Sequence, residues 1–478
     1  MNLSMILEMA ASNGDRAVAT VGDRTLTAAR LDTLARRAAV GFRNHPAVLY
    51  SGANHLAYPV ALFGAALAGV PFVPLNYRLG EQQLTALKDR HPGALVLDEA
   101  DLDALTDDAL GEVDTSDLEG QWDGDAVAAI IYTSGTTSDP KPAILRHRHL
   151  LAYVLNTMEF ASAAETDASL VSVPPYHIAG LTNLLSNFYT GRRVVYLAAF
   201  DPKVWLDTVR REKVTHAMLV PTMLARIVAE LGDDEAATPS LASLAYGGSR
   251  TPRPVLEHAL RVFPHTGFVN AYGLTETASS IAVLGPDDHR VAFASDDPAV
   301  RERLGSVGRP LPGIEIEIRT EDGERVEPGH SGLIYVRGEQ ISGEYGNRSV
   351  LDGEGWFSTR DLGHLDSDGY LFVEGRSDDT IIRGGENIAP AEIEDVLLAH
   401  PGVTEAAVIG VSDAEWGQRL VAVLVGSADP EEVRQWVKDR LRSSKTPDTI
   451  VFRDELPKTE TGKLLRRNLL AELENTHA

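Results

Sequence analysis

Short apolar segments alternate with amphipathic ones through the first three quarters of the chain. Apolar runs bounded by turn residues predict buried strands over 126–133, 169–173, 193–196, 217–220, 243–246 and 267–271. Helical periodicity over 202–213 and 222–231 places helices between several of these strands. Strands that alternate with helices are typical of parallel sheets covered on both faces, so the pattern predicts an α/β fold.

The stretch 56–75, LAYPVALFGAALAGVPFVPL, carries no charge and imitates a membrane span. Pro59, Pro71, Pro74 and Gly69 divide it, and the apolar run barely reaches the ~20 residues that a span needs. The pattern favours a buried helix near 57–68, ended by Gly69, and then a short strand near 70–74.

After about residue 305 the pattern changes to short alternating strands between Gly, Pro and acidic turns, which is typical of antiparallel β structure. A third pattern follows Arg376. It consists of a strand, a Gly-rich turn, a helix (390–400), two strands (406–411 and 420–425), a helix and a final strand. Asp429 followed by Pro430 marks the start of the second helix. The third pattern predicts a small α+β domain.

Charge and composition narrow the classes of partner. The 478 residues include 44 Lys and Arg against 69 Asp and Glu, a formal net charge of −25. Nucleic acids and anionic membranes bind clustered cations, so both are disfavoured. The absence of Cys excludes disulfides, thiolate metal sites and a Cys nucleophile. The first residues show no secretory signal pattern, and we expect a cytoplasmic protein.

A hydroxyl-rich loop follows the apolar segment 130–132 and reads TSGTTSDPKP over 133–142. Such a loop can turn backbone N–H groups and hydroxyls toward a polyphosphate, although ordinary turns share this composition. The patterns GxxxxGK[ST], GxGxxG, HExxH and GxSxG are absent from the sequence. Their absence weakens the P-loop, dinucleotide-binding, zinc-protease and α/β-hydrolase alternatives.

Five further segments carry polar residues in turn-like contexts. They are NAYGLTET (270–277), STRD (358–361), GRSDD (375–379), RGGEN (383–387) and LPKTETGK (456–463). We expect STRD to end a turn. In this order and at these separations, the motifs resemble those of the adenylate-forming superfamily of acyl-CoA synthetases, peptide-synthetase adenylation domains and luciferases. The resemblance runs from about Gly69 to Asn468 and is strongest for the acyl-CoA synthetase, or acid–thiol ligase, branch.

The resemblance implies an architecture. A large N-terminal domain over 1–376 would contain two αβ sheets and a β subdomain. A hinge at 377–378 would join it to a small mobile α+β lid over 379–478. Asp378 falls at the family's hinge position, and the turn that forms the CoA tunnel matches Arg383, Gly384 and Gly385.

The resemblance also implies roles in the nucleotide site, carried over by position. The phosphates of ATP would be held by Thr133, Ser134, Gly135, Thr136, Thr137 and Lys141. The adenine would meet Gly247, Gly248, Ser249 and Tyr272, and the ribose would meet Asp361 and Arg376. Glu276 resembles the Mg²⁺ ligand, Thr275 the α-phosphate contact and Lys463 the lysine required for adenylation.

The segment PPYHIAGL over 174–181 resembles the family's acyl-pocket motif, with His177 as the gate beside the substrate carboxylate. The residues expected to line the pocket are uncharged: Ile178, Gly180, Leu181, Asn183, Gly247, Ala271, Gly273 and Ser279. A buried substrate ammonium needs a paired carboxylate, and none is visible here. We therefore predict an apolar acid, fatty or aromatic, the former implying lipid metabolism.

These motifs predict an enzyme that uses ATP, Mg²⁺ and CoA to form acyl-AMP and pyrophosphate, and then acyl-CoA and AMP. Two alternatives of other kinds are a ligase that loads an acyl carrier protein and a non-catalytic nucleotide-binding homologue. The family loop usually has Gly where this chain has Ser138 and Pro142, which favours the second alternative. Arg466 or Arg467 is expected to meet the CoA phosphates. The sequence leaves monomer and homodimer open.

Overall fold

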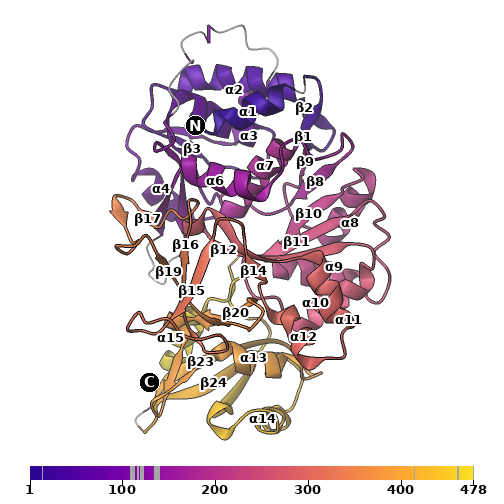
Figure 1. Ribbon diagram of the computed structural model, residues 1–478, viewed down its shortest axis with the longest axis vertical. Coiled ribbons are helices and arrows are strands. Elements are labelled where there is room, and N and C mark those ends of the chain that lie inside the picture. The colour runs from indigo at the N-terminus through magenta and orange to yellow at the C-terminus, as the bar shows by residue number, and fades with distance from the viewer. Residues whose placement is uncertain are drawn as a thin grey trace.

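The computed structural model describes residues 1–12, 14–107, 114, 115, 118, 123–133, 140–413, 415–459 and 462–476. The fold is mixed α/β, with a large N-terminal domain built on several sheets and a small C-terminal domain below it in Figure 1. Among the described residues, no helix is both long and apolar enough to cross a membrane.

The largest sheet has nine strands within the described part of the chain, in the order β14-β13-β12-β11-β10-β8-β9-β1-β2. Its strands are β1 (Ala17–Val21), β2 (Arg24–Thr27), β8 (Ala168–Val171), β9 (Arg193–Tyr196), β10 (His216–Leu219), β11 (Ser243–Gly247), β12 (Gly267–Leu274), β13 (Ser279–Leu284) and β14 (Arg309–Pro310). The pairs from β9 through β12 are parallel, and the pairs β12–β13 and β1–β2 are antiparallel. The predicted strands between 169 and 271 are confirmed, with small shifts at their ends.

The second sheet runs β18-β17-β7-β6-β4-β3-β5. Its strands are β3 (Val48–Tyr50), β4 (Phe72–Pro74), β5 (Leu95–Leu97), β6 (Val127–Thr133), β7 (Lys141–Arg146), β17 (Glu344–Tyr345) and β18 (Arg348–Ser349). The helix α3 (Ala57–Ala68) ends at Gly69, whose φ of 70° is left-handed. The predicted buried helix and strand in 56–75 are therefore confirmed.

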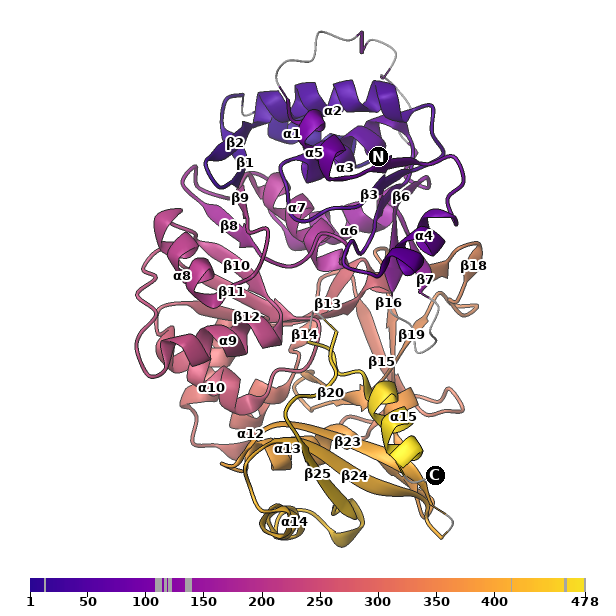
Figure 2. The ribbon, with the colours of Figure 1, turned by 180° about the vertical axis from the view of Figure 1, so that it is seen from behind.

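Helices cover both sheets (Figures 1 and 2). In the large domain they are α1 (Ser4–Ala11), α2 (Ala28–Phe42), α4 (Glu81–Lys88), α5 (Glu99–Leu105), α6 (His147–Thr157), α7 (Ile178–Thr190), α8 (Pro202–Arg211), α9 (Pro221–Leu231), α10 (Arg253–Val262), α11 (Pro286–Ala294) and α12 (Pro298–Glu302). Short 3₁₀ turns occur at η2 (Thr275–Thr277) and η3 (Arg303–Gly305).

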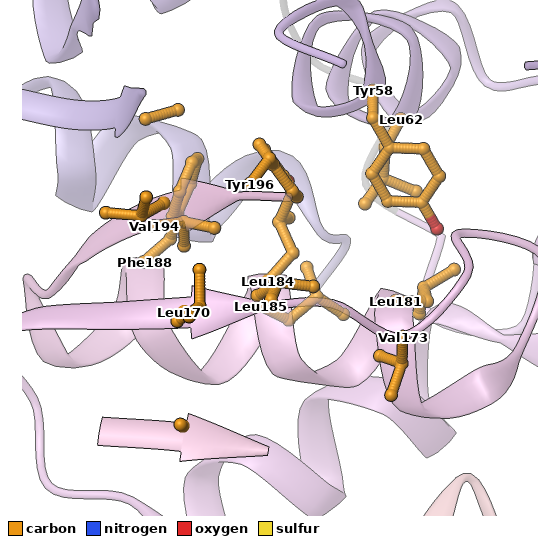
Figure 3. Packing of buried hydrophobic residues seen from close by; sticks show 14 of the residues in the cluster. Tyr58, Leu62, Leu170, Val173, Leu181, Leu184, Leu185, Phe188, Val194 and Tyr196 are labelled. Carbon is orange, nitrogen blue, oxygen red and sulfur yellow. The ribbon is translucent and has the colours of Figure 1, made fainter. Parts of the chain in front are cut away.

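The helix α7 forms the centre of the main hydrophobic core. Its leucines Leu181, Leu184 and Leu185 pack with Phe188 against strands β8 and β9 and toward α3, as Figure 3 shows. Every residue from Gly180 to Thr190 is buried except Asn183. Because α7 is buried on almost all sides, it is a fixed internal element from which side chains can be presented.

The β subdomain is the antiparallel sheet β15-β16-β19-β20, as predicted. Its strands are β15 (Glu315–Arg319), β16 (Gly332–Arg337), β19 (Phe357–Leu365) and β20 (Leu371–Arg376). The expectation that Ser358–Asp361 ends a turn is wrong, because this segment lies inside β19. Arg360 within it has a φ of 60°, a left-handed value unusual for a non-glycine residue in a strand.

The C-terminal domain follows the 3₁₀ turn η4 (Ser377–Asp379). It contains the hairpin β21 (Ile381–Arg383) and β22 (Glu386–Ile388), the sheet β23 (Val403–Asp413), β24 (Gly417–Gly426) and β25 (Thr449–Arg453), and the helices α13 (Pro390–Leu398), α14 (Pro430–Lys438), α15 (Arg466–Thr476) and η5 (Ser443–Lys445). The predicted cap is confirmed, since the Asp429 carboxylate accepts the N–H groups of Glu431 and Glu432. Two hydrophobic clusters drawn from residues after 380 form its own core.

Among the contacts that join the small domain to the large one are an ion pair and a close backbone approach. Arg250, after β11, forms an ion pair with Asp395 of α13. The segment between β25 and α15 rises toward the nine-stranded sheet in Figure 2, and Gly462 lies against Thr222 at the start of α9. The turn that contains Gly462 therefore contacts the large domain, whereas α15 after it packs on the small domain.

Candidate active site

Three strands bring one carboxylate, one guanidinium and one phenol together. Asp361 of β19 is the register partner of Arg376 of β20, and Arg376 Nη1 lies 3.1 Å from Asp361 Oδ1. The hydroxyl of Tyr272, in β12, donates to Asp361 Oδ2 at 2.5 Å. We call these three residues the ribose cluster, because a fixed carboxylate beside a cation can accept hydrogen bonds from two neighbouring hydroxyls.

Burial sets the electrostatics of the ribose cluster. Asp361 is 5% exposed, and this burial raises its pKa even though Arg376, the Tyr272 hydroxyl and Lys463 act in the opposite direction. Burial, together with the Asp361 charge, raises the pKa of Tyr272 far above its usual range. Tyr272 is therefore a neutral donor at physiological pH.

Lys463 comes within electrostatic reach of this cluster through a tight turn. Lys463 N donates to Thr459 Oγ1 at 3.0 Å, and Thr459 N donates back to Lys463 O at 2.8 Å. Gly462 has a φ of 78°, and a Cβ there would lie 2.1 Å from Thr222 Cγ2. Only glycine fits both the backbone conformation and the close approach to α9. This contact fixes the distance between the turn and the large domain.

Glu276 is buried in η2 and held from two sides. Its backbone carbonyl accepts the N–H groups of Ser342 at 2.8 Å and Gly343 at 3.2 Å. The Tyr345 hydroxyl, from β17, donates to Glu276 Oε1. Burial raises the pKa of Tyr345, and the Glu276 carboxylate adds to the shift, so Tyr345 stays protonated. Thr275 begins the same 3₁₀ turn and accepts the Ala278 N–H at 3.1 Å.

The donor set at Glu276 fits magnesium rather than a transition metal. In the described part of the chain, no three His, Cys, Asp or Glu residues come together in a way that could hold a metal. Mg²⁺ usually binds one or two carboxylates and completes its shell with phosphate oxygens and water. A single buried carboxylate beside the predicted phosphate loop therefore suits Mg²⁺ delivered with ATP.

The predicted adenine side is shaped by glycines at the carboxyl end of β11. Gly247 pairs with Ala271, and a Cβ on Gly247 would lie 2.2 Å from the Ala271 carbonyl oxygen. Gly248 follows with a φ of 89°, and Ser249 is half-buried. A flat ring can approach such a bare backbone next to Tyr272 on the adjacent strand.

The phosphate loop is described only at its two ends. Thr133 ends β6 opposite Lys141 of β7, and Thr133 Oγ1 donates to the Lys141 carbonyl at 3.4 Å. Ser134, Gly135, Thr136, Thr137 and Ser138 lie outside the described residues. Pro142 is the second residue of β7, and its carbonyl accepts the Gly346 N–H at 3.1 Å. Pro142 is therefore accommodated near the start of a strand, where a missing N–H is tolerated.

The predicted acyl-pocket residues fall into two groups. Half-buried positions are His177, Ile178, Asn183, Ala271, Gly273 and Ser279. The Thr182 hydroxyl lies 3.1 Å from Ser279 Oγ, which ties α7 to β13. Leu181 is fully buried in the core (Figure 3), and Gly180 packs against the Pro174 carbonyl. Leu181 thus shapes the pocket from behind and does not present a surface to it.

The predicted CoA-tunnel turn lies on the small domain. Gly384 and Gly385 have φ values of 57° and 82° between β21 and β22. Arg383 binds Asp448 through two hydrogen bonds and lies over the Trp416 ring at 5.6 Å. Asp378 lies in η4 at the start of the domain. Arg466, one of the two arginines expected to meet the CoA phosphates, binds the Glu394 carboxylate with both its amino groups.

Three residues of the site escaped sequence reasoning: Tyr345, Thr222 and Asp448. Each acts on a partner far along the chain, such as Thr222 on Gly462, and none stands in a recognisable motif. Pro221 before Thr222 signals a helix start, but no local pattern says what approaches it.

The chain is similar to known proteins over most of its length. Residues 7–345 match the family model of the AMP-binding enzyme, and residues 392–463 match that of the AMP-binding enzyme C-terminal domain. The chain is 37% identical over 451 residues to a feruloyl-CoA synthase of an Amycolatopsis species, covering 90% of this chain and 89% of the relative. It is 33% identical over 484 residues to the indoleacetate–CoA ligase of Aromatoleum aromaticum, covering 92% of each.

A solved structure is similar over nearly the whole length. The o-succinylbenzoate coenzyme A synthetase of Bacillus subtilis, in complex with ATP and magnesium ion, is 32% identical and covers 98% of each chain with a TM-score of 0.80. The chain therefore belongs to the AMP-binding enzymes of the adenylate-forming superfamily, in the acyl-CoA synthetase branch of acid–thiol ligases.

Proposed function

We propose that this chain activates an aromatic carboxylic acid with ATP and transfers the acyl group to CoA. The observation that carries the proposal is the approach of Lys463 to the ribose cluster across the domain boundary, where its charge opposes the rise that burial causes in the pKa of Asp361. The aromatic class is favoured because feruloyl-CoA synthase and indoleacetate–CoA ligase, both at least 33% identical, are named for aromatic acids.

In the first half-reaction a carboxylate oxygen of the acid attacks the α-phosphorus of ATP, and the bond from that phosphorus to the β-bridging oxygen breaks. Pyrophosphate leaves and acyl-AMP remains. Two anions meet in this step, so positioned cations lower the barrier. Lys463 supplies one charge, Asp361 and Arg376 hold the ribose, and Glu276 would hold Mg²⁺, which neutralises phosphate charge when bound.

In the second half-reaction the CoA sulfur, as thiolate, attacks the acyl carbon and AMP leaves. We infer that Lys463 serves the first half-reaction and the 383–385 turn the second, so a rotation at 377–378 would exchange them. The proposed units are residues 1–376 and 379–478. Proline at 378 fixes φ and should slow this exchange.

The test is release of pyrophosphate in the presence of ATP and a panel of aromatic and fatty acids, followed by mass detection of acyl-CoA. Release with aromatic acids and a CoA thioester is expected. Faster turnover of fatty acids would replace the aromatic class and restore a role in lipid metabolism. ATP binding without pyrophosphate release for any acid would point to a non-catalytic homologue, and transfer only to a carrier protein would replace CoA as acceptor.

A further inference from the structure

One face of the nine-stranded sheet carries partly exposed residues although helix α7 covers it. Along β10, β11 and the first three residues of β12, residues alternate between buried and half-buried, and the rest of β12 is half-buried. The buried set, such as Leu244 and Tyr246, belongs to the main core. Successive side chains of a strand point to opposite faces, so the half-buried set shares the other face. Its members are His216, Met218, Ser243, Ala245, Gly267, Val269 and Ala271.

Helix α7 approaches this half-buried side of the sheet at Asn183. Asn183 Nδ2 lies 4.0 Å from Met218 Sδ, and Asn183 is the one residue between Gly180 and Thr190 that is not buried. A polar residue that keeps exposed surface in the middle of a buried helix borders open space inside the domain. That space starts at the predicted acyl pocket, because Ala271 and Gly247 end the same rows of residues.

The far end of this face is polar and rich in donors. Asn187, one turn after Asn183, donates to Asn183 Oδ1 at 2.7 Å and accepts from Arg192 Nη1 at 2.9 Å. Arg192 Nε is buried and has no hydrogen-bond partner among the described residues. A buried donor without a partner is unfavourable, so an acceptor placed here would be bound strongly.

His216 closes the same end. It is the register partner of Ser243, four positions before Gly247, so it lies roughly 13 Å from the nucleotide end at ~3.3 Å per strand residue. Burial lowers the pKa of His216 to about 4, with Arg192 adding to the shift. A neutral imidazole beside a guanidinium offers hydrogen bonds without adding a second charge. Asp167 is the acidic group that acts on both.

We propose that Asn183, Asn187, Arg192 and His216 form a specificity site that selects an aromatic acid with an oxygen acceptor at the end opposite its carboxylate. The proposal rests on the proposed function and sharpens it. The oxygen is that of a hydroxyl, a methoxy group or a second carboxylate, and the acid extends along the half-buried face between α7 and β10–β12. A site that binds such an oxygen disfavours acids lacking it, because its donors would then stay unpaired.

The experiment compares cinnamic acid with its 4-methyl, 4-hydroxy, 4-methoxy and 4-carboxy derivatives by pyrophosphate release in the wild-type enzyme. We expect kcat/KM for the preferred oxygenated acid to exceed that for the 4-methyl acid, which matches the 4-hydroxy acid in size, by roughly 10- to 100-fold. Comparison of the 4-hydroxy and 4-methoxy acids with the 4-carboxy acid shows whether the site prefers a neutral oxygen or a carboxylate. Asn183→Leu should abolish the preference, and Asn156→Leu, on exposed surface of α6, should retain it.

The outcomes distinguish failure of the specificity site from failure of the proposed ligase activity. Equal or better use of the 4-methyl acid, or a preference that survives both Asn183→Leu and Arg192→Gln, overturns the specificity site and leaves the ligase intact. Absence of pyrophosphate with every acid overturns the proposed function itself. The wild-type panel decides even where a variant fails to fold, and thermal unfolding with ATP binding shows whether each variant is folded.

Discussion

Arg383 and Asp448 are joined by two parallel hydrogen bonds, 2.6 Å from Nη1 to Oδ2 and 2.7 Å from Nη2 to Oδ1. Asp448 Oδ2 also accepts the Leu420 N–H at 2.8 Å, which ties the pair to β24. The predicted CoA-tunnel turn is therefore held in shape by a residue 65 positions away. Asp448 acts through Arg383 and is a positioning residue.

Asp448→Asn removes one charged acceptor and should loosen this turn. We expect thioester formation from supplied acyl-AMP to fall roughly 10- to 100-fold, the order of loss that a small misplacement causes. Pyrophosphate release should stay near the wild-type rate. The exposed Asp454→Asn, in the same domain, serves as the matched control. Equal losses in both half-reactions would assign Asp448 a general structural role.

Lys463→Ala should reduce adenylation by about two or more orders of magnitude, because one of the charges that meet the phosphates is lost. Thioester formation from supplied acyl-AMP should survive. Lys438→Ala, at the exposed end of α14, removes a lysine of the same domain far from the turn. Retention of full pyrophosphate release in Lys463→Ala would disprove the assignment.

Gly462→Ala should prevent the 458–463 turn from closing. The new Cβ would meet Thr222 at 2.1 Å and would also adopt a left-handed φ, which costs roughly 1 kcal/mol. We expect adenylation to fall at least about tenfold. Gly369→Ala has the same strain at φ 80° but nothing within 4 Å of its Cβ, so it separates strain from collision. Similar activities of the two variants would contradict the role of the Thr222 contact.

Tyr345→Phe should weaken the magnesium site without disturbing the nucleotide site. Glu276 loses the hydrogen bond that orients its carboxylate, so the affinity for Mn²⁺ in the presence of ATP should fall several-fold, since supporting partners of a ligand tune metal affinity. Calorimetric titration measures this directly, with AMP binding without metal as the internal reference. Tyr335→Phe on β16 is the control, and an unchanged Mn²⁺ affinity in Tyr345→Phe would remove Tyr345 from the site.

His364→Gln should change how stability depends on pH. The hydrogen bond that His364 Nδ1 donates to Glu374 Oε1, at 2.7 Å, raises the pKa of His364. Burial opposes ionisation of Glu374, but hydrogen bonds from His364 and Ser331 outweigh it and lower the pKa of Glu374.

The two pKa shifts determine how the stability of the fold depends on pH. A raised histidine pKa stabilises the fold below the unfolded value of about 6.5, and this contribution is lost as pH rises through the folded pKa. A lowered glutamate pKa stabilises it above about 4.5 and is lost at more acidic pH. The Tm difference between wild type and His364→Gln should peak between about pH 5 and 6.5 and shrink by pH 8.5. A difference that grows toward pH 8.5 would contradict this.

Local chemistry explains which parts of the fold were predictable. Gly69 ends α3 and Asp429 caps α14 through contacts with their immediate neighbours, so the sequence contains the whole signal. The strand β19 was missed because polar residues and the left-handed Arg360 interrupt its apolar alternation at Ser358–Asp361. Strand pairing then decides the conformation, and pairing is not a local property.

The candidate site likewise contains residues that sequence motifs indicate and residues that only the folded chain brings together. The residues Glu276, Asp361 and Lys463 came from the resemblance to a family, since nothing local distinguishes them from turn residues on a surface. Tyr345 and Thr222 meet their partners across 69 and 240 positions, and only the folded chain brings them together. Asn183 was placed at the acyl pocket, but the donors beyond it, Asn187 and Arg192, became visible only through their hydrogen bonds.

The small domain has a hydrophobic core of its own. The two hydrophobic clusters of residues after 380 share no member with those of the large domain. If the small domain rotates as a rigid body, its internal hydrophobic contacts are kept. Only the interdomain interface, which includes the Arg250–Asp395 ion pair, must break and form again. Solvent-exposed ion pairs contribute little stability, so the two orientations of the small domain can be close in free energy. Substrates can then shift the equilibrium between them.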